Sequence, residues 1–526
     1  MAWLSNLLGR GERFVASVGA QVVKQSAGPD TPSADTTCMV DQWRLISDVM
    51  EGNDAIKAGA ERYLPRFARE SEQKYRRRLA DAPWRPIFPS AVESLTSRPF
   101  AKPVTVEGKV STEMKAFATD VDMLGNNINV FSRGIFNDGV TFGVVGIFVD
   151  FNRVIPGPDT EPLSLAEEKE LGVRPFWVKI RPQDFLDVRT DARNGKQVIT
   201  HARWRECAAV HDGFAEAFVE RVRHFELDDA GKPHWKLWEK PAKGADYVVI
   251  AEGDLTIAEI PLVLFFTGRR KGTFAVKPPL YDLAIMSLEH YRAMARSTEI
   301  ENFSGWPTLV GVGMAAPDPK TTTDASTGER ETASQIEIGP GITLFAPPSG
   351  ADGKTDWKII GPDAALVAEV AKSPERVMDE FRRLAMEPMV QKSGNVTATA
   401  SAIDNSRAHS AIEAWSCALK DSLDQALMFT SMWLAQSDQV TANVSTDFVA
   451  MVGSTEEAKV IADAQKRSVL SAKTERAELK RRSILAPDWD EDQEELQIAL
   501  EREGLEPEEP FNPVNGDLIP FERVAS

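Results

Sequence analysis

The sequence predicts an α+β fold built from several structural regions, and three observations lead to this prediction. The 526 residues are enough for more than one domain with a sizeable core. Residues 176–266 alternate between apolar and polar side chains, which is typical of β-strands. Long stretches on either side carry apolar side chains at three- or four-residue spacing, which is typical of helices.

The first part of the chain predicts a linker followed by helices. Residues 1–40 end in a polar, proline-containing stretch, so we expect a mobile arm. The next segment, 41–52, places Trp43, Ile46 and Met50 on one helix face, and Gly52 is suited to end that helix. Further helices are predicted over residues 53–64, 69–80, 111–124 and 126–139.

The predicted strands are rich in β-branched and aromatic residues and are separated by Gly, Asp or Pro. They cover residues 100–108, 141–151, 176–182, 197–207, 215–227, 233–240, 246–253 and 260–266.

After residue 277 the pattern predicts long helices with a small β-rich insert. A helix over 278–303 opens with prolines at its first turn. A strand at 305–314 follows, then a polar insert at 315–334 and two short strands within 335–350. A helix over 362–385 must kink or restart at Ser373-Pro374, since proline cannot donate to the preceding turn.

The last third predicts one very long helix and a terminal helical region. A Gly- and Thr-containing loop precedes a helix that runs from about residue 398 to 435, a length suited to a scaffold strut. A strand at 439–448 comes next, and two or three helices are predicted within residues 453–504. Ser471 is positioned to cap the second of these with Thr474 and Glu475.

Charge is unevenly distributed along the chain. There are 61 Lys and Arg against 79 Asp and Glu, which gives a net charge of −18 and argues against a broad basic nucleic-acid-binding face. Residues 487–510 carry eleven acidic side chains and one arginine. The candidate acidic group in this region comprises Asp488, Asp490, Glu491, Asp492, Glu494 and Glu495.

The most basic segment is residues 61–85, with eight basic and four acidic side chains. Its basic candidates are Arg62, Arg66, Arg69, Lys74, Arg76, Arg77 and Arg78. They could contact DNA phosphates or an acidic neighbouring subunit. The favoured alternative is a solvated helix face neutralised by local carboxylates.

No catalytic, cofactor or metal site is expected. Gly353-Lys354-Thr355 lacks the earlier glycine of a phosphate-binding loop, and the Gly311/Gly313/Ala316 pattern is not followed by a helix. A metal site from His201, Cys207 and His211 is conceivable, but a structural role is favoured. The three cysteines are far apart, which indicates reduced thiols, and no apolar stretch is long enough to cross a membrane.

The order of segments resembles the portal proteins of tailed bacteriophages. The N-terminal similarity lies in Trp43, Gly52, Tyr63-Leu64-Pro65, Glu70, Tyr75, Arg78, Phe100, Lys102 and Pro103. The central similarity covers residues 260–266, 278–302 and 306–313, and the C-terminal similarity covers 447–451 and 469–495. The N-terminal extension and the insert at 315–334 depart from the family pattern.

The resemblance implies a ring of about twelve subunits at one capsid vertex of the virion, through which double-stranded DNA passes. It further implies contacts with the major capsid protein, a terminase and a head-tail adaptor, assembly in the host cytoplasm, and neither enzymatic activity nor membrane association. The implied regions are an arm (1–40), a wing (41–277), stem helices (278–303 and 362–385), a clip (304–361), a tunnel loop (386–397), a strut helix with a return strand (398–450), a crown (451–510) and a tail (511–526).

Within the tunnel loop, the resemblance places Gln391, Lys392, Ser393 and Asn395 near DNA, with Lys392 as the basic group that would touch phosphates transiently. The alternative for Lys392 is exposure to solvent away from DNA. An alternative is a different capsid-associated protein, such as a minor head or connector subunit that does not line a channel. A hydrolase or nuclease with an unrecognised site is a further, disfavoured alternative.

Overall fold

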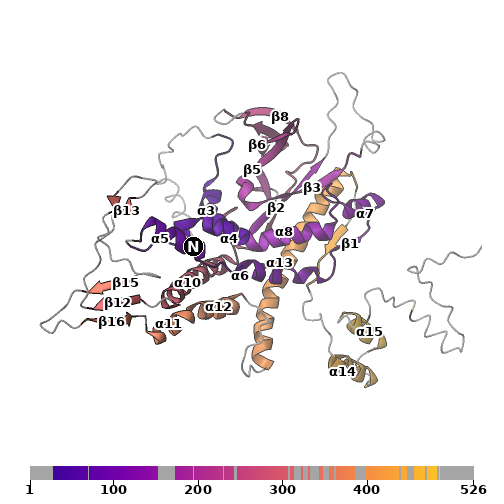
Figure 1. The fold of residues 1–526 in the computed structure, drawn as a ribbon. Coiled ribbons are helices and arrows are strands. Elements are labelled where there is room, and N and C mark those ends of the chain that lie inside the picture. The colour runs from indigo at the N-terminus through magenta and orange to yellow at the C-terminus, as the bar shows by residue number, and fades with distance from the viewer. Residues whose placement is uncertain are drawn as a thin grey trace, which may run out of the picture. The chain divides into compact units, whose positions relative to one another are not determined.

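The structure is a computed structural model in which helices and sheets occupy separate stretches, so the α+β prediction is confirmed (Figure 1). It describes residues 28–68, 70–151, 172–193, 195–228, 230–241, 246–305, 308–312, 322–323, 330–331, 343–346, 355–360, 363–385, 398–436, 440–446, 455–467 and 471–481, with single positions at 469, 485 and 494. The chain divides into two compact units, Met1–Thr446 and Asp447–Ser526.

The first described helix, α3 (Ala34–Glu51), begins earlier than predicted. Ser33 is its N-cap and accepts a hydrogen bond from the Thr36 backbone N–H, so part of the expected mobile arm is helical. The Ser, Thr and Asp residues that suggested a linker are the residue types that start a helix. Gly52 ends the helix as predicted, with a φ of 92° that favours glycine.

Short helices complete the N-terminal block. They are α4 (Asn53–Ala58), η1 (Ala60–Arg62), α5 (Glu72–Asp81), α6 (Ile87–Thr96), η2 (Arg98–Ala101), α7 (Thr112–Thr119) and α8 (Ile128–Phe142). The helix predicted over 53–64 is therefore two shorter ones, and its break coincides with a positive φ at Ala60. α7 ends at Thr119, before the predicted end of that helix.

A three-stranded antiparallel sheet forms the centre of the first unit, with strand order β3-β2-β9. Its strands are β3 (Pro175–Ile180), β2 (Val144–Phe151) and β9 (Leu262–Phe266). α8 packs on this sheet at Gly139, where a Cβ would overlap the ring of Phe265. A larger side chain at residue 139 would therefore push the helix away from the sheet.

A five-stranded antiparallel sheet has strand order β4-β5-β6-β7-β8. Its strands are β4 (Phe185–Arg193), β5 (Lys196–Asp212), β6 (Ala215–Leu227), β7 (Pro233–Glu239) and β8 (Val248–Asp254). One face joins the core through Trp204 and Phe225, which stack on each other and contact Phe148 of the central sheet. Smaller elements between β3 and α10 are η3 (Pro182–Asp184), β10 (Arg269–Arg270) and β11 (Val276–Lys277).

Two packed helical segments flank a small sheet, as the pattern predicts. α10 (Tyr281–Gly305) packs against α11 (Ala364–Ala371) and α12 (Ser373–Leu384). Between them, β12 (Thr308–Val312) pairs with β15 (Thr343–Ala346) and β16 (Asp356–Ile360), while β13 (Thr322–Thr323) pairs with β14 (Arg330–Glu331). The helix restarts at Ser373, because Pro374 is accepted in a first turn.

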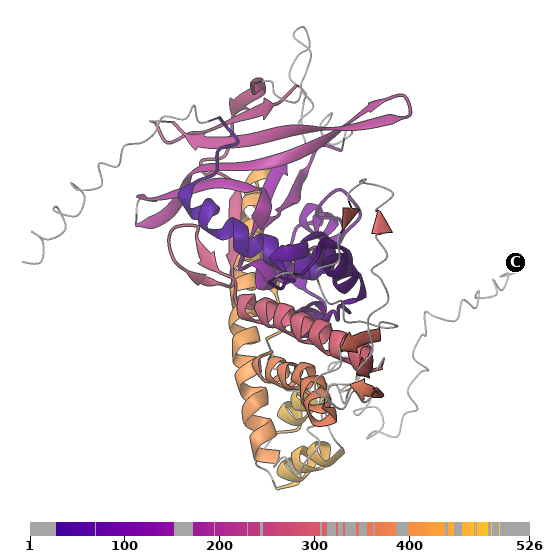
Figure 2. The same ribbon diagram turned by 60° about the vertical axis from the view of Figure 1, so that its left-hand side comes forward.

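The long helix α13 (Ala398–Trp433) has 36 residues and packs on the central sheet (Figures 1 and 2). It is followed by β17 (Val440–Asn443), which pairs antiparallel with β1 (Thr105–Gly108). The chain thus returns from the last helix of this unit to a strand more than three hundred residues earlier.

The second unit contains α14 (Thr455–Lys466) and α15 (Ala472–Arg481), which pack together. The Thr474 backbone N–H donates to Ser471 Oγ, so the predicted cap is present. A third helix predicted over 490–504 lies outside the described residues except for Glu494. Among the described residues of both units, no helix is long and apolar enough to span a membrane.

Candidate functional site

Two of the predicted site groups lie largely outside the described residues. Gln391, Lys392, Ser393 and Asn395 all fall in 386–397, and of the acidic group only Glu494 is described. The structure does not test their roles, and their contact with DNA or with a neighbouring subunit stays a prediction.

The basic segment around α5 is described except for Arg69, and most of its arginines face nearby carboxylates. The pairs are Arg62–Asp48, Arg66–Glu61, Arg66–Glu72, Arg76–Glu72 and Arg77–Asp81. Lys74 is exposed on the same helix. These pairs fit the interpretation of a locally neutralised helix face, while contact with DNA phosphates remains a prediction.

Arg78 differs from the other arginines because it is buried. Its guanidinium forms two hydrogen bonds with Glu70, at 2.8 and 2.7 Å, and a third with the Pro65 carbonyl at 2.9 Å. It also lies over the ring of Phe67. The hydrogen bond from Arg78 holds the pKa of Glu70 below its usual value. Arg78 therefore fixes the turn before α5 and presents little charge to solvent.

The C-terminal half of α13 is attached to the sheets by side-chain hydrogen bonds. Trp177 Nε1 on β3 donates to Thr430 Oγ1 at 2.9 Å, inside the core. Trp433 Nε1 donates to the Val149 carbonyl on β2 at 3.3 Å. Asp424 accepts from the Ala442 backbone N–H on β17 at 2.6 Å. The helix is thus bonded to three different strands.

The second face of the five-stranded sheet carries a row of charged residues and histidines, here called the polar stripe. Each of its five strands contributes two residues at alternate positions, so that all point to one side. The members of the polar stripe are Asp187, Arg189, His201, Arg203, His224, Glu226, His234, Lys236, Glu252 and Asp254.

Asp187 is the anionic centre at one end of the polar stripe, and it is buried. Its Oδ2 lies 2.8 Å from Arg189, 3.4 Å from His201 Nε2 and 3.5 Å from Arg203. Arg203 also donates to the carbonyls of Pro29 and Thr31, so the segment before α3 crosses this end of the sheet. Three cationic or potentially cationic side chains share one carboxylate here.

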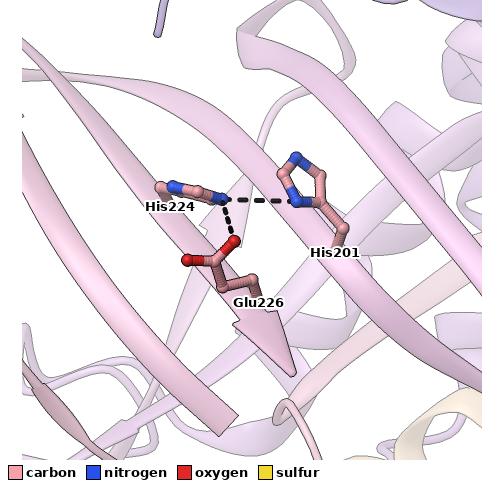
Figure 3. A group of neighbouring side chains, drawn as sticks. All are labelled: His201, His224 and Glu226. Carbon is pink, nitrogen blue, oxygen red and sulfur yellow. Dashed lines mark hydrogen bonds and ion pairs between the residues drawn. The ribbon is translucent and has the colours of Figure 1, made fainter. Parts of the chain in front are cut away.

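Two histidines meet at the middle of the polar stripe, next to Glu226 (Figure 3). His201 Nδ1 and His224 Nε2 are 3.3 Å apart, and Glu226 Oε2 lies 3.8 Å from the same His224 nitrogen. Register explains the meeting: His201 is directly opposite Glu226, and His224, two residues before Glu226 on β6, points to the same side of the sheet. These side chains offer three ligand atoms within reach of one ion.

Burial favours the neutral form of both imidazoles. Burial, followed by the charge of His224, lowers the pKa of His201 to about 4. Burial also lowers the pKa of His224, although the carboxylate of Glu226 opposes this effect. Neutral imidazole is the form that binds metal ions.

The conceivable cluster of His201, Cys207 and His211 does not assemble. All three lie on β5, and six residues of extended strand separate the first two by about 20 Å. The partners of His201 come instead from β6. Sequence spacing alone could not show this, because the pairing register of two strands decides which residues meet.

Comparison with protein families gives one match, to a family described as a domain of unknown function (DUF4055), over residues 279–434. No curated protein matches the chain. The matched region begins just before α10 and ends just after α13, so it contains the small sheet and the helices on either side of it.

Among the solved structures with some likeness are three from gene transfer agent (GTA) particles, each at 12% identity. The neck of a native GTA particle with C12 symmetry aligns over 74% of this chain and 88% of that chain, with a TM-score of 0.35. The neck of an empty particle with C6 symmetry aligns over 80% and 90%, with a TM-score of 0.35. A chain of the native GTA virion aligns over 86% and 99%, with a TM-score of 0.34. These TM-scores are too low to establish a common fold.

Proposed function

We propose that this chain is a portal subunit of a tailed phage or phage-like particle, which forms a ring at one capsid vertex and passes double-stranded DNA. The observation that carries the proposal is the order of elements from α10 to α13. A 25-residue helix leads into a small sheet, a broken helical segment packs back along it, and a 36-residue helix follows. This is the stem, clip and strut order of the portal family that the sequence resembles.

The attachment of α13 supports a load-bearing role. Its C-terminal half is bonded to β2, β3 and β17, so the long helix is fixed to the body of the subunit. A ring that passes DNA needs such a rigid connection between its wall and its outer body. The same arrangement would serve a connector that does not line a channel, which is the alternative.

The charge of the chain supports passage of DNA without tight binding. DNA carries one negative charge per about 1.7 Å of its axis, so a strongly basic channel would hold it in place. The net charge of −18 and the eleven acidic residues of 487–510 would repel phosphates. In this proposal Lys392 is the basic group that makes brief contact with DNA.

The β5–β6 hairpin offers a surface for contact between neighbouring subunits. Gly213 closes its turn with a φ of 62°, and three apolar side chains near the turn are exposed: Val210, Phe214 and Phe218. Exposed apolar side chains commonly mark protein contacts, and here they project from both faces of the hairpin, because Phe218 pairs with Ala209 and Val210 with Ala217. A second copy of this chain is the partner that a ring requires.

Packaging energy would come from a separate terminase ATPase, and the small sheet at 304–361 would meet this motor first and a head-tail adaptor later. The major capsid protein would surround the ring at its vertex, in the virion. Deletion of 304–361 is expected to leave a folded subunit that no longer supports packaging in a capsid assay.

The proposal is tested by electron microscopy and light scattering of the purified full chain. Rings with an open central hole are expected, with a mass of about twelve subunits. Phe214→Asp with Phe218→Asp should reduce ring formation, whereas Glu252→Gln, an exposed change on β8 outside this hairpin, should not. A compact monomer would overturn the proposal, and a closed oligomer without a hole would favour the non-channel connector.

A further inference from the structure

The histidine pair in the polar stripe has the spacing of two ligands on one metal ion. Zinc binds histidine nitrogens at about 2.0–2.1 Å, so two such nitrogens at a tetrahedral angle lie about 3.3 Å apart. His201 Nδ1 and His224 Nε2 are 3.3 Å apart. Glu226 Oε2 is 3.8 Å from His224 Nε2, and the three ligand atoms all lie within 4.8 Å of one another.

We propose that His201, His224 and Glu226 form a binding site for a divalent transition-metal ion of the zinc class. Two imidazoles and one carboxylate are a ligand set that suits Zn²⁺. Glu226 is the most exposed of the three, with 42% of its side-chain surface accessible. The fourth position of a tetrahedral ion therefore faces solvent and takes a water molecule.

Metal binding requires a change of tautomer at His201. Without metal, Arg203 Nε donates to His201 Nε2 at 3.2 Å, so the proton of this imidazole is on Nδ1, next to His224. An ion at Nδ1 displaces that proton to Nε2. There the N–H faces Asp187 Oδ2, at 3.4 Å. Arg203 Nε loses His201 Nε2 as its acceptor and must turn away from it, while the guanidinium retains its hydrogen bonds to Pro29 and Thr31. The imidazole of His201 stays neutral, so metal binding changes the position of its proton and not the number of protons that it carries.

Asp187 is the group that would orient the site. Metal-binding histidines commonly donate their second N–H to a carboxylate, which fixes the ring and strengthens the ligand. Asp187 is buried on β4, the strand paired with β5. The register places Arg189 opposite His201 and Asp187 opposite Arg203. Its position on the far side of the His201 ring from the proposed ion is the one that this role requires.

The surrounding charges limit the affinity without preventing binding. Arg189 and Arg203 face Asp187, and Lys236 Nζ lies 3.6 Å from Glu226 Oε1, the oxygen that does not face His224. Arg189 and Lys236 thus contact the outer side of a carboxylate, whereas Arg203 lies close both to Asp187 and to His201 Nε2. Arg189 is largely exposed and screened by water. We expect an affinity below that of a fully enclosed structural zinc site.

The site is tested on the full chain after removal of metals with a chelator. Isothermal titration with ZnCl₂ should give one bound ion per chain, and CoCl₂ should produce the visible absorption of four-coordinate Co²⁺. His224→Gln and Glu226→Gln should each weaken binding by at least about 100-fold, and Asp187→Asn by about 10- to 100-fold.

Two histidines provide matched controls. His211→Gln alters an exposed residue at the other end of β5, and His234→Gln alters a neighbour in the polar stripe that pairs with Asp254. Both variants should bind Zn²⁺ with unchanged stoichiometry. Circular dichroism separates loss of ligand from loss of fold in every variant.

Absence of Zn²⁺ and Co²⁺ binding by the folded wild-type chain would overturn the proposal. Equal binding by folded wild type and His224→Gln would overturn it as well, because the ion would then be elsewhere. Neither result depends on ring formation, so this test and the test of the portal proposal fail independently.

Discussion

The helix α5 and the polar stripe both hold many charged side chains, but they assemble them in different ways. In α5 the exposed partners are neighbours along the helix, such as Arg76 with Glu72 and Arg77 with Asp81, each four residues apart. In the polar stripe the partners come from five strands between Asp187 and Asp254. The difference shows that a helix encodes its ion pairs locally, whereas a sheet encodes them through strand register.

Burial provides a second contrast within the same two regions. Arg78 and Glu70 are almost fully enclosed, and Asp187 is enclosed with its cations around it. The pairs Arg76–Glu72 and Arg77–Asp81 are largely exposed. We therefore expect the loss of unfolding free energy on mutation to increase with the burial of the ion pair and not with its number of partners.

The largest effect is expected for Arg78→Ala. It leaves Glu70 as a buried charge without its main partner, and the loss should be about 3–5 kcal/mol of unfolding free energy. Urea unfolding followed by tryptophan fluorescence measures this loss. A loss below about 1 kcal/mol would show that the pair is solvated and that burial does not separate the two classes.

A pH titration sharpens the same contrast. Arg78 lowers the pKa of Glu70, so the ionised pair adds stability above the unfolded-state pKa of this carboxyl, and that stability is lost as the pH falls through the lower folded-state value. Glu70→Gln should flatten this acid-side loss in urea midpoints measured from pH 6 downward. The stability that wild type loses on protonation of Glu70 should be smaller than the loss caused by Arg78→Ala, because a protonated Glu70 still accepts a hydrogen bond. An unchanged slope in the variant would contradict the assignment.

Asp187→Asn should have an intermediate effect. It removes the only negative charge that Arg189 and Arg203 share in the described part of the polar stripe, at a buried position. The expected cost is about 1–3 kcal/mol of unfolding free energy, because the amide oxygen still accepts one hydrogen bond. Thermal unfolding of the variant in the absence of metal measures it. Glu252→Gln, at the exposed end of the polar stripe, is the control and should cost little.

The smallest effect is expected for Arg76→Ala. Its bond to Glu72 is exposed, and such helix pairs contribute about 0.3–0.5 kcal/mol. Raising the salt concentration should remove even this difference from wild type. A loss comparable to that of Arg78→Ala would indicate that Arg76 contacts another subunit. The ring proposal allows such a contact, and repeating the measurement on the monomer would remove it.

The sequence predicts helices and most strands well where the apolar spacing is regular. The alternation of β5, β6 and β7 and the long spacing of α10 and α13 identified these elements. β4 was not predicted as a separate strand, although residues 186–189 alternate between apolar and polar side chains. β16 was missed as well, because its alternation from Asp356 to Ile359 is only four residues long, which is a weak signal.

The candidate sites were predicted less completely than the fold. The local carboxylate partners of the basic segment follow from helical spacing, but the burial of Arg78 depends on packing of the preceding turn. The meeting of His201 with His224 depends on the length of the β5–β6 hairpin and its register. A count of alternate positions back from the Gly213 turn would have paired His201 with Glu226, which is the one signal available in the sequence.

The three bonds that hold α13 have a mechanical consequence. Because Asp424, Thr430 and Trp433 are bonded to different strands, a slide of the helix by one turn along its axis would break all three bonds together. A force applied to the N-terminal end of α13 is therefore transmitted through these anchors to β2, β3 and β17. Substitution of these anchors would leave the buried side chains Leu423, Leu427 and Phe429 to resist that slide alone.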